Sequence, residues 1–423
     1  MDGRPPQPAL RFGEAAALRG AMAVCAVTGT KGKTTTATMI DACVAAAGRP
    51  RARSTTLGAW RGDEPVGSPG TPGLFSLALQ RAAEVAAEVF TVEATSLALL
   101  GGFARTFPPD VAVFTNLSRD HVELHGSLEA YLDAKAELFR SLRPGGAMVL
   151  NACSPASAEV ARAAPAGTRR LAYAASDAAP PCAGWPLELH AAAVRATREG
   201  TRVTLDGPLA APLGGELHLR VPLDVNVDNA LAAAVAASAL GIAGEAIRRG
   251  LEGYAGVPGR LDVLSLKPWV LVDFAHHAAP LERVLRGVRA ALDAEGEGGR
   301  LTCVFGCGGG RDPEQRPAMG RVAAAHAHRV VVTSDNARGE RPEDIADAIE
   351  RGFAGAPAGG VRERELDRAK AIAMAVRDAR PEDAVVIAGK GAEREIHLGR
   401  ERRPFSDADV ARKSLAARAE ERP

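Results

Sequence analysis

The stretch VTGTKGKTTTA, residues 27–37, begins at the last residue of the apolar run AMAVCAV, residues 21–27. An apolar run predicts a buried strand, and the Ala-rich segment after the threonines has a helical period. A strand that leads through a Gly-, Lys- and Thr-rich turn into a helix is typical of a phosphate-binding loop in an α/β domain. The alternative is an ordinary polar turn in which the two lysines have no special role.

The residue types in this turn suit a bound polyphosphate. Glycines let backbone N–H groups turn towards an anion, and the following helix adds the favourable end of its dipole. Lys33 is positioned to reach the β- and γ-phosphates, and the Thr34 hydroxyl to ligate Mg²⁺. The predicted nucleotide-binding residues of this stretch are Gly29, Thr30, Lys31, Gly32, Lys33, Thr34 and Thr35.

The length, net charge and distribution of apolar residues restrict the classes of protein to which this chain can belong. The chain has 423 residues, of which 46% are hydrophobic, and a formal net charge of +1. This length suffices for two or three domains with real cores. The balanced charge gives no support to a nucleic-acid surface. No run of 18 apolar residues indicates a membrane span, and the polar N-terminus MDGRPPQPALRFGE does not resemble a secretory signal.

The cysteine and lysine usage adds two expectations. The six cysteines are scattered without a C-x-x-C pair, which is typical of buried thiols in a reducing cytoplasm. Only seven of the 52 basic residues are lysines. Because Arg supplies the ordinary surface charge, a retained lysine is a candidate for chemistry that Arg cannot perform. The sequence leaves open whether the protein is a monomer or a dimer.

Val-rich runs alternate with segments of helical period along most of the chain. Such alternation predicts α/β units on mainly parallel sheets. A segment over 185–221 alternates polar and apolar residues between turn glycines, which predicts a small antiparallel addition. Predicted strands lie at 22–28, 88–94, 111–117, 147–151, 269–275, 301–306, 329–334 and 384–389, and predicted helices at 33–47, 128–141, 226–240, 280–292, 317–327, 342–354 and 366–379.

A Gly/Pro cluster, YAGVPGR at 254–260, predicts a domain boundary. We expect a short N-terminal segment over 1–21 and a central P-loop α/β domain with a mainly parallel sheet over 22–256. A C-terminal Rossmann-like α/β domain is expected over 257–423.

Two further polar clusters follow predicted strands. Glu93 ends the strand in EVFTVEA, and TNLSRDH places Asn116 and His121 after another. Because ligands of parallel sheets bind outside the carboxyl ends of the strands, these side chains should converge with the phosphate loop. Carboxylate and imidazole both suit divalent ions, so Glu93 and His121 are candidate ligands of a second metal. Each alone is equally consistent with a cap or a surface group.

Lys135 lies in YLDAKAELF, on the predicted helix just beyond. In an Arg-rich chain the choice of Lys here is suggestive, and the alternative is a helix-surface lysine.

The ordered set GTKGKTTT, EATSLAL, TNLSRDHVELHGSLEAYLDAKAELF, VDFAHHAAPLERVL, VFGCGGGRDPEQRPAMG, VVVTSDNARGERPEDI and VIAGKGAE resembles the Mur ligase family. The resemblance covers residues 22 to about 410. Within the family it is most similar to the UDP-N-acetylmuramoyl-tripeptide synthetases that add meso-diaminopimelate.

The resemblance implies an ATP-dependent acid–amino acid ligase. ATP phosphorylates a carboxylate, and an amine attacks the acyl phosphate to form an amide with release of ADP and phosphate. The implied metal site uses Mg²⁺ on Thr34, Glu93, His121 and a carbamylated Lys135, and a carbamate would explain why Arg is not used at 135. Lys33, Lys135, His121 and Glu93 are the implied catalytic residues. Further implied ATP contacts are Asn116, Asn226, Asn229, Arg260, Asp273 and His276, although Asn229 suits a helix cap equally well.

The same resemblance implies where the substrates bind. Thr71 and Ser96 would meet the acceptor carboxylate. The amino acid would be held by Arg311, Asn336, Arg338, Gly389 and Glu393. Arginines pair with carboxylates and glutamate with an ammonium group, so an amino acid with a distal charged head group fits better than lysine. The chain departs from the family pattern at Leu97, Ala337 and Ala392, and in FAHHAAPL.

The sequence leaves the acceptor open. Only about 21 residues precede the first predicted strand, so we expect no N-terminal UDP-binding domain of the kind the family uses. We expect a small-molecule or carrier-bound carboxylate acceptor, with neither nucleic acid nor membrane as a partner. The alternatives are a shortened muramyl-tripeptide synthetase in cell-wall synthesis, a folylpolyglutamate-type or cyanophycin-type ligase, a non-catalytic ATP-binding partner subunit and a motor-like ATPase.

Overall fold

A computed structural model of the chain describes residues 18–71, 73–118, 122–175, 182, 184–223, 225–355, 360–399 and 401–421. It is an α/β protein with two mainly parallel sheets, in two compact units. Unit 1 comprises residues 1–195, 202–219 and 225–254, and unit 2 comprises 196–201, 220–224 and 255–423. No helix in the described ranges is long and apolar enough to cross a membrane.

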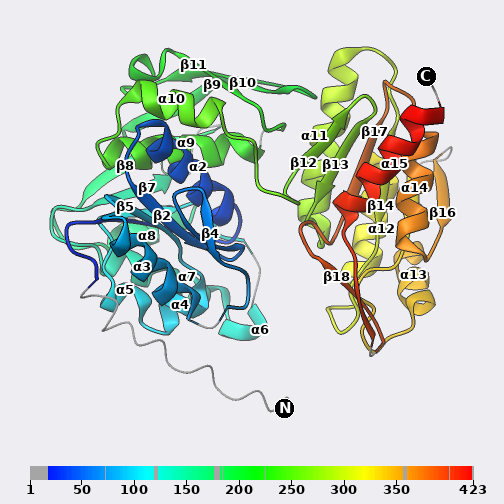
Figure 1. Ribbon diagram of the computed structural model, residues 1–423, viewed down its shortest axis with the longest axis horizontal. Coiled ribbons are helices and arrows are strands. Elements are labelled where there is room, and N and C mark those ends of the chain that lie inside the picture. The colour runs from blue at the N-terminus through cyan, green and yellow to red at the C-terminus, as the bar shows by residue number, and fades with distance from the viewer. Residues whose placement is uncertain are drawn as a thin grey trace. The chain divides into compact units, whose positions relative to one another are not determined.

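The large sheet has eleven strands in the order β11-β10-β9-β8-β7-β6-β1-β5-β2-β3-β4 (Figure 1). Its centre, from β8 to β2, is parallel, whereas β2, β3 and β4 form an antiparallel meander at one edge. The strands are β1 (Ala23–Thr28), β2 (Arg51–Thr55), β3 (Gly58–Arg61), β4 (Glu64–Gly67), β5 (Val89–Glu93), β6 (Val111–Phe114), β7 (Ala147–Asn151), β8 (Arg169–Ala174), β9 (Leu187–Thr197), β10 (Gly200–Asp206) and β11 (Glu216–Leu219).

Helices cover both faces of this sheet (Figure 1). Successive residues of a strand point to opposite faces, and accordingly Val24 and Ala26 of β1 belong to a core that α3, α5 and α7 close. Four aromatic rings of that core, Phe75, Phe90, Phe103 and Phe107, pack against one another. The helices of this unit are α2 (Lys33–Ala46), α3 (Leu74–Glu84), α4 (Ser96–Leu100), α5 (Phe103–Thr106), α6 (Val122–His125), α7 (Leu128–Arg140), α8 (Ser157–Ala163), η1 (Ala211–Leu213), α9 (Val225–Ala239) and α10 (Gly244–Glu252).

Unit 2 has a six-stranded sheet in the order β12-β13-β17-β14-β15-β16, parallel except for β12. The β17 sequence AVVIA is buried along its whole length, as expected of a central parallel strand with helices on both sides. A separate hairpin joins β18 and β19. The elements are β12 (Asp262–Leu266), β13 (Trp269–Asp273), α11 (Ala278–Glu295), β14 (Leu301–Phe305), α12 (Gln315–His326), β15 (Arg329–Val332), α13 (Pro342–Glu350), η2 (Arg351–Phe353), β16 (Val361–Arg364), α14 (Arg368–Asp378), β17 (Ala384–Ala388), β18 (Glu395–Leu398), β19 (Glu401–Pro404) and α15 (Asp407–Glu421).

The tip of the β9–β10 hairpin belongs to unit 2 although most of both strands belongs to unit 1. Arg198 at this tip is buried and its Nε lies 2.7 Å from Glu295 Oε2. Its Nη1 donates to the carbonyl oxygens of Leu266 at 3.1 Å and Pro381 at 3.3 Å. One guanidinium therefore connects α11 with the turns that flank β12 and β17.

The cysteines provide a direct test of the packing. Burial raises the pKa of five thiols, and for two of them, Cys303 and Cys307, to about 12. The other three are Cys25, Cys43 and Cys182. Only the partly exposed Cys153 should therefore react with iodoacetamide at pH 8 in the native protein, and all six should react in urea. Rapid native labelling of several thiols, located by peptide mass spectrometry, would contradict this packing.

Candidate functional site

The phosphate loop joins β1 to α2 in a conformation that requires glycine. Gly29 and Gly32 have φ of 146° and 84°, and Gly32 begins α2 with no side-chain cap. A Cβ at Gly29 would lie 2.0 Å from Thr115 Oγ1. With no side chain at the cap, the first N–H groups of a 14-residue helix are left for an anion.

Residues that follow β6 form hydrogen bonds with the backbone of this loop. The Thr30 N–H donates to the Asn116 carbonyl at 2.8 Å, and the Lys31 N–H to Asn116 Oδ1 at 3.0 Å. Thr115 Oγ1 donates to the Lys31 carbonyl at 2.6 Å. Asn116 thus uses its side chain to fix the loop backbone. Lys31 is exposed, whereas Lys33 is partly buried and its Nζ donates to the Thr30 carbonyl at 2.9 Å.

Helix α9 presents Asn229 to the same loop. Thr36 Oγ1 donates to Asn229 Oδ1 at 3.2 Å, and a Cβ on Gly32 would lie 2.2 Å from that oxygen. Asn229 Nδ2 lies 3.4 Å from Asn226 Oδ1, and both residues are buried. Asn229 therefore packs against the start of α2, and the structure does not use it as the cap of its own helix.

Glu93, at the carboxyl end of β5, lies beside the phosphate loop. Its Oε2 accepts from Thr34 Oγ1 at 2.7 Å, from Thr56 Oγ1 at 3.0 Å and from the Thr56 N–H at 3.1 Å. Glu93 Oε1 has no hydrogen bond to any other described residue. A carboxylate and a threonine hydroxyl next to a phosphate loop form a donor set that suits Mg²⁺.

The predicted metal ligand His121 lies outside the described residues. The described ranges contain no cluster of three or more His, Cys, Asp or Glu that could hold a metal ion alone. Mg²⁺ usually binds through one or two protein oxygens and completes its shell with substrate phosphates and water. Thr34 and Glu93 fit that pattern.

Replacing Thr56 by Val should weaken Mg²⁺ binding if Glu93 is the ligand that the sequence predicts. The substitution removes the Oγ1 donor to Glu93 Oε2 and leaves the backbone donor in place. Outer hydrogen bonds of this kind orient the ligating carboxylate, so the Mg²⁺ concentration for half-maximal activity should rise about tenfold. Thr168→Val, which removes an exposed hydroxyl that donates to the Pro165 carbonyl, is the control. An unchanged Mg²⁺ requirement in Thr56→Val would show that Glu93 is positioned without this hydroxyl.

Lys135 is buried within the core of the phosphate-binding region. Its residue is 1% exposed, and its Nζ donates to the Gly29 carbonyl at 2.7 Å and lies 4.0 Å from the Tyr131 ring centroid. Ser127 caps α7 by accepting from the Ala130 N–H, which fixes the helix that carries Lys135. The surface-lysine alternative is therefore excluded, and the structure brings Lys135 to the phosphate loop.

The two predicted acceptor residues lie in different segments of unit 1. Ser96 begins α4 and is buried, with His125 Nε2 3.0 Å from its hydroxyl oxygen. Thr71 precedes α3, and its Oγ1 accepts from the Ser68 N–H at 3.2 Å.

In unit 2, the predicted nucleotide residues surround Asp273 at the end of β13. Its carboxylate accepts from the N–H groups of Leu261 and Ala275, each at 2.8 Å. Burial raises the Asp273 pKa, and these two N–H donors oppose that shift. Arg260 lies over the Phe274 ring at 5.4 Å, and His276 Nδ1 is 2.8 Å from the Phe274 carbonyl.

Arg311 and Arg338 meet at Gly308. A Cβ on Gly308 would lie 3.1 Å from Arg338 Nη1 and 3.6 Å from Arg311 Cγ. Arg338 has a left-handed φ of 52°, a strained conformation for Arg, and its Nη1 donates to the Gly309 carbonyl at 2.6 Å. Arg311 is exposed and makes no hydrogen bond or ion pair with the residues that the structure describes.

Asn336 and Glu393 are joined, because Asn336 Nδ2 donates to Glu393 Oε2 at 2.8 Å. Gly389, at φ 115°, lies where a Cβ would come within 2.7 Å of Asp335 Oδ2. These residues follow the carboxyl ends of β15 and β17, the edge at which ligands of parallel sheets bind. The structure thus brings together Asn336, Gly389 and Glu393, with Arg311 and Arg338 close to each other.

Three residues in contact with these groups were not predicted from the sequence. Thr56 bonds Glu93, His125 bonds Ser96, and Lys390 bonds both Asn336 and Glu393. The sequence signal for Lys390 was its place among only seven lysines, directly after a buried strand.

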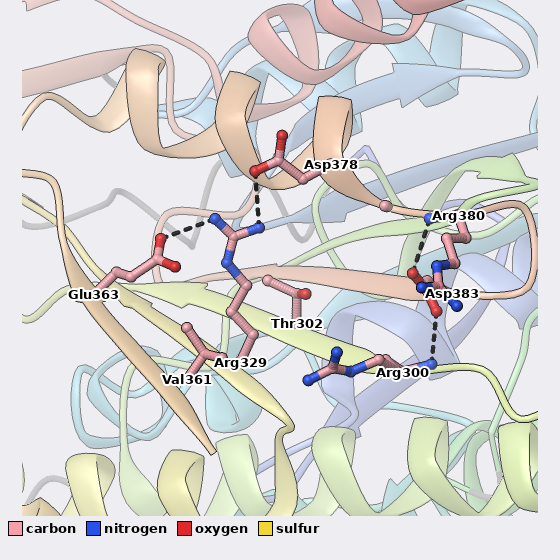
Figure 2. A pocket seen from close by; sticks show the side chains of 9 residues that line it. Arg300, Thr302, Arg329, Val361, Glu363, Asp378, Arg380 and Asp383 are labelled. Atoms are coloured by element: carbon pink, nitrogen blue, oxygen red, sulfur yellow. Dashed lines mark hydrogen bonds and ion pairs between the residues drawn. The ribbon is translucent and has the colours of Figure 1, made fainter. Parts of the chain in front are cut away.

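A cavity of 340 Å³ lies at the opposite, amino-terminal edge of the unit 2 sheet, where β14, β15 and β17 begin. Figure 2 shows Arg329 between Glu363 and Asp378. Its Nη2 lies 2.8 Å from Glu363 Oε2 and its Nη1 lies 3.1 Å from Asp378 Oδ2. Asp383 accepts from the N–H groups of Arg300 and Arg380. The carboxylates that line the cavity, on Glu363, Asp378 and Asp383, thus already have partners within the protein, and we assign no substrate to this cavity.

Two parts of the chain match known protein families. Residues 27–237 match the Mur ligase middle domain. Residues 259–391 match the Mur ligase glutamate ligase domain.

Individual relatives extend this similarity. The UDP-N-acetylmuramoyl-L-alanyl-D-glutamate–2,6-diaminopimelate ligase of Thermosynechococcus vestitus is 38% identical over 405 residues, covering 94% of this chain and 77% of that protein. A solved ligase of the same name has a TM-score of 0.70 at 29% identity, covering 98% of this chain and 84% of that chain. The Mycobacterium tuberculosis folylpolyglutamate synthase complexed with ADP has a TM-score of 0.68 at 20% identity, covering 98% and 95%, which shows a shared fold.

Proposed function

Because this chain belongs to the Mur ligase family of ATP-dependent acid–amino acid ligases, we propose that it adds an amino acid with a charged distal head group to a carboxylate acceptor. The observation that carries the proposal is the pair of polar groups beyond β14, β15 and β17. One group offers guanidinium donors, on Arg311 and Arg338, and the other offers the Glu393 carboxylate. A head group with both a carboxylate and an ammonium matches them.

The proposed reaction has two steps. An oxygen of the acceptor carboxylate attacks the γ-phosphorus of ATP, and ADP leaves. The amine nitrogen of the amino acid then attacks the acyl carbon, inorganic phosphate leaves, and the nitrogen loses a proton as the amide forms. Two anions must meet in the first step, so positioning and neutralisation of charge are the main tasks of the protein.

The residues of the phosphate loop suit these tasks. The N–H groups at the start of α2 would bind phosphate oxygens, and Lys33 would leave the Thr30 carbonyl to reach the transferred phosphate. Mg²⁺ bound to Thr34 and Glu93 would neutralise phosphate charge. Asn116 and Asn229 would keep the loop in its binding conformation through the contacts described above.

A more specific candidate is the addition of diaminopimelate to UDP-N-acetylmuramoyl-L-alanyl-D-glutamate. It is favoured by the names of the curated relatives, which are up to 38% identical to this chain. The alternative is a smaller or carrier-bound acceptor with the same amide chemistry.

The test is release of phosphate from ATP with Mg²⁺, using meso-diaminopimelate or L-lysine with either the UDP-sugar dipeptide or small γ-carboxylate acids. Release that requires both acceptor and amino acid supports the ligase proposal, and the productive acceptor distinguishes the two candidates. Release without an amino acid would indicate a different ATPase, and ATP binding without turnover would indicate a partner subunit. Either result would contradict the proposal.

The amino-acid preference gives a sharper expectation. Diaminopimelate should exceed L-lysine in kcat/KM by about thirtyfold, because only its distal carboxylate can pair with a guanidinium. Arg311→Met should remove most of that preference. Arg286→Met, on the exposed face of α11, is the matched control. Equal use of the two amino acids by the unaltered protein would exclude recognition of the distal carboxylate.

A further inference from the structure

Lys390 is a lysine with no exposed side-chain surface, in the turn that follows β17. A fully buried lysine is rare unless it is paired, because its charge loses hydration. It lies between Gly389 and Gly391, and all three residues are buried. The side chain therefore points into unit 2, and its charge needs internal partners.

Those partners are both predicted amino-acid-binding residues. Lys390 Nζ donates to Glu393 Oε2 at 2.7 Å and to Asn336 Oδ1 at 3.0 Å. Asn336 Nδ2 closes a triangle by donating to the same Glu393 oxygen. The His397 N–H also donates to Asn336 Oδ1 at 3.0 Å, so both acceptor sites of the amide oxygen are used.

The triangle leaves one carboxylate oxygen available to a ligand. Glu393 Oε2 is held by two donors, whereas Oε1 has no hydrogen bond within the described part of the chain. The Glu393 side chain is 40% exposed, so this oxygen has access to solvent.

The backbone of the turn has other supports. The Gly389 N–H donates to the Asp273 carbonyl at 3.0 Å, and the Glu393 N–H to the Lys390 carbonyl at 3.0 Å. A Cβ on Gly391 would lie 2.6 Å from the Gly259 carbonyl oxygen, so the turn packs directly against that backbone. The lysine ammonium is thus not what fixes the path of the chain here.

We propose that Lys390 is a positioning residue that holds the Glu393 carboxylate oriented to receive the distal ammonium group of the incoming amino acid. This inference rests on the proposed function and adds to it. Lys390 does not contact the substrate, and it acts through the Lys390–Asn336–Glu393 triangle. Arg311 and Arg338 remain the residues for the distal carboxylate.

The proposal predicts that a Lys390 variant raises KM only for amino acids that carry a distal ammonium group. Lys390→Met keeps most of the side-chain volume but removes the donor. It should raise KM about tenfold for meso-diaminopimelate and also for L-lysine, because both carry a distal ammonium. It should leave 2-aminopimelate, which has the distal carboxylate without the ammonium, within about twofold, as substrate or competitive inhibitor, since no Glu393–ammonium contact is then lost. The KM for ATP should not change.

A double-mutant cycle identifies the route of the effect. If Lys390 acts through Glu393, adding Lys390→Met to Glu393→Gln should cost little beyond Glu393→Gln alone. Lys370→Met, whose side chain is 73% exposed, is the matched control. Lys390→Gln, whose amide can donate to both oxygens, is the second variant if Lys390→Met does not fold, and it should retain part of the affinity.

The outcomes are distinct. If the unaltered protein shows no amino-acid-dependent phosphate release, the proposed function and this inference both fail. If it is active and the two Lys390 variants change KM equally for 2-aminopimelate and diaminopimelate, or if the cycle is additive, only this inference fails. A loss confined to the unfolding temperature, with unchanged KM values, would make Lys390 a structural residue and would also overturn it.

Discussion

Replacing Lys33 by Met should reduce amino-acid-dependent phosphate release about a thousandfold, because one preorganised positive charge at the transferred phosphate is lost. Lys33 is the residue of the loop whose ammonium lies inside it, 2.9 Å from the Thr30 carbonyl. The loop path itself depends on Gly29, Gly32 and the contacts of Asn116, which the substitution leaves intact. The loss should fall on kcat rather than on the KM for the amino acid, as measured by steady-state phosphate release.

Lys31 provides the matched control for Lys33. Lys31 is exposed. The hydrogen bonds that hold the loop at this residue are made by its backbone N–H and its carbonyl oxygen. Lys31→Met should therefore cost far less than Lys33→Met. Equal losses in the two variants would mean that the loop contributes general positive charge and that Lys33 has no specific place in phosphoryl transfer.

We propose that Lys135 helps to place the metal, and with that role its replacement by Met should reduce activity about a hundredfold. In the carbamylated form that the family resemblance implies, the nitrogen would keep one N–H for the Gly29 carbonyl, and the added carboxylate would supply oxygen ligands for Mg²⁺. Short carboxylates such as acetate should then restore part of the activity of Lys135→Met. 13C NMR of the unaltered protein at neutral pH in 13C-bicarbonate should detect the carbamate carbon.

Lys135→Arg distinguishes the carbamate from a plain cation. Arginine keeps a positive donor near the Gly29 carbonyl but cannot form this carbamate. We expect Lys135→Arg to be as inactive as Lys135→Met. Two results together would contradict the carbamate: an active Lys135→Arg variant, and no response of the unaltered protein to bicarbonate depletion. They would mean that the positive charge of the unmodified lysine is what activity requires.

Of the six central strands of the large sheet, β1, β5, β6 and β7 were predicted from sequence to within a few residues, as were β13, β14, β15 and β17 of unit 2, whereas β2 and β8 were not. Strands such as β6 and β17 are buried on both faces, so each is a continuous apolar run. The edge meander was not predicted, because RARST and EPVG lack apolar alternation. Such strands form where pairing to a neighbour already in place outweighs their own sequence preference.

The residues of the candidate site also divide into those that the sequence could identify and those that it could not. Residues within motifs, such as Glu93 and Asn116, could be named from their place after a strand. Lys135 also carried a sequence signal of burial, since Tyr131, Leu132, Leu138 and Phe139 surround it at helical spacing. Contacts made between distant segments could not be read in this way. Thr56 meets Glu93, and Lys390 meets Asn336, only because the sheets align their strand ends.

The position of Arg198 has a practical consequence for dividing the protein. A fragment starting at residue 257 would contain Glu295 and the carbonyls of Leu266 and Pro381, but it would lack the guanidinium that binds them. Glu295 would lose its main counter-charge, and the hairpin left on the other fragment would carry an unpaired arginine. Separate expression of the C-terminal part therefore calls for residues 196–201 to be supplied as well, or for Glu295 to be replaced by a neutral residue.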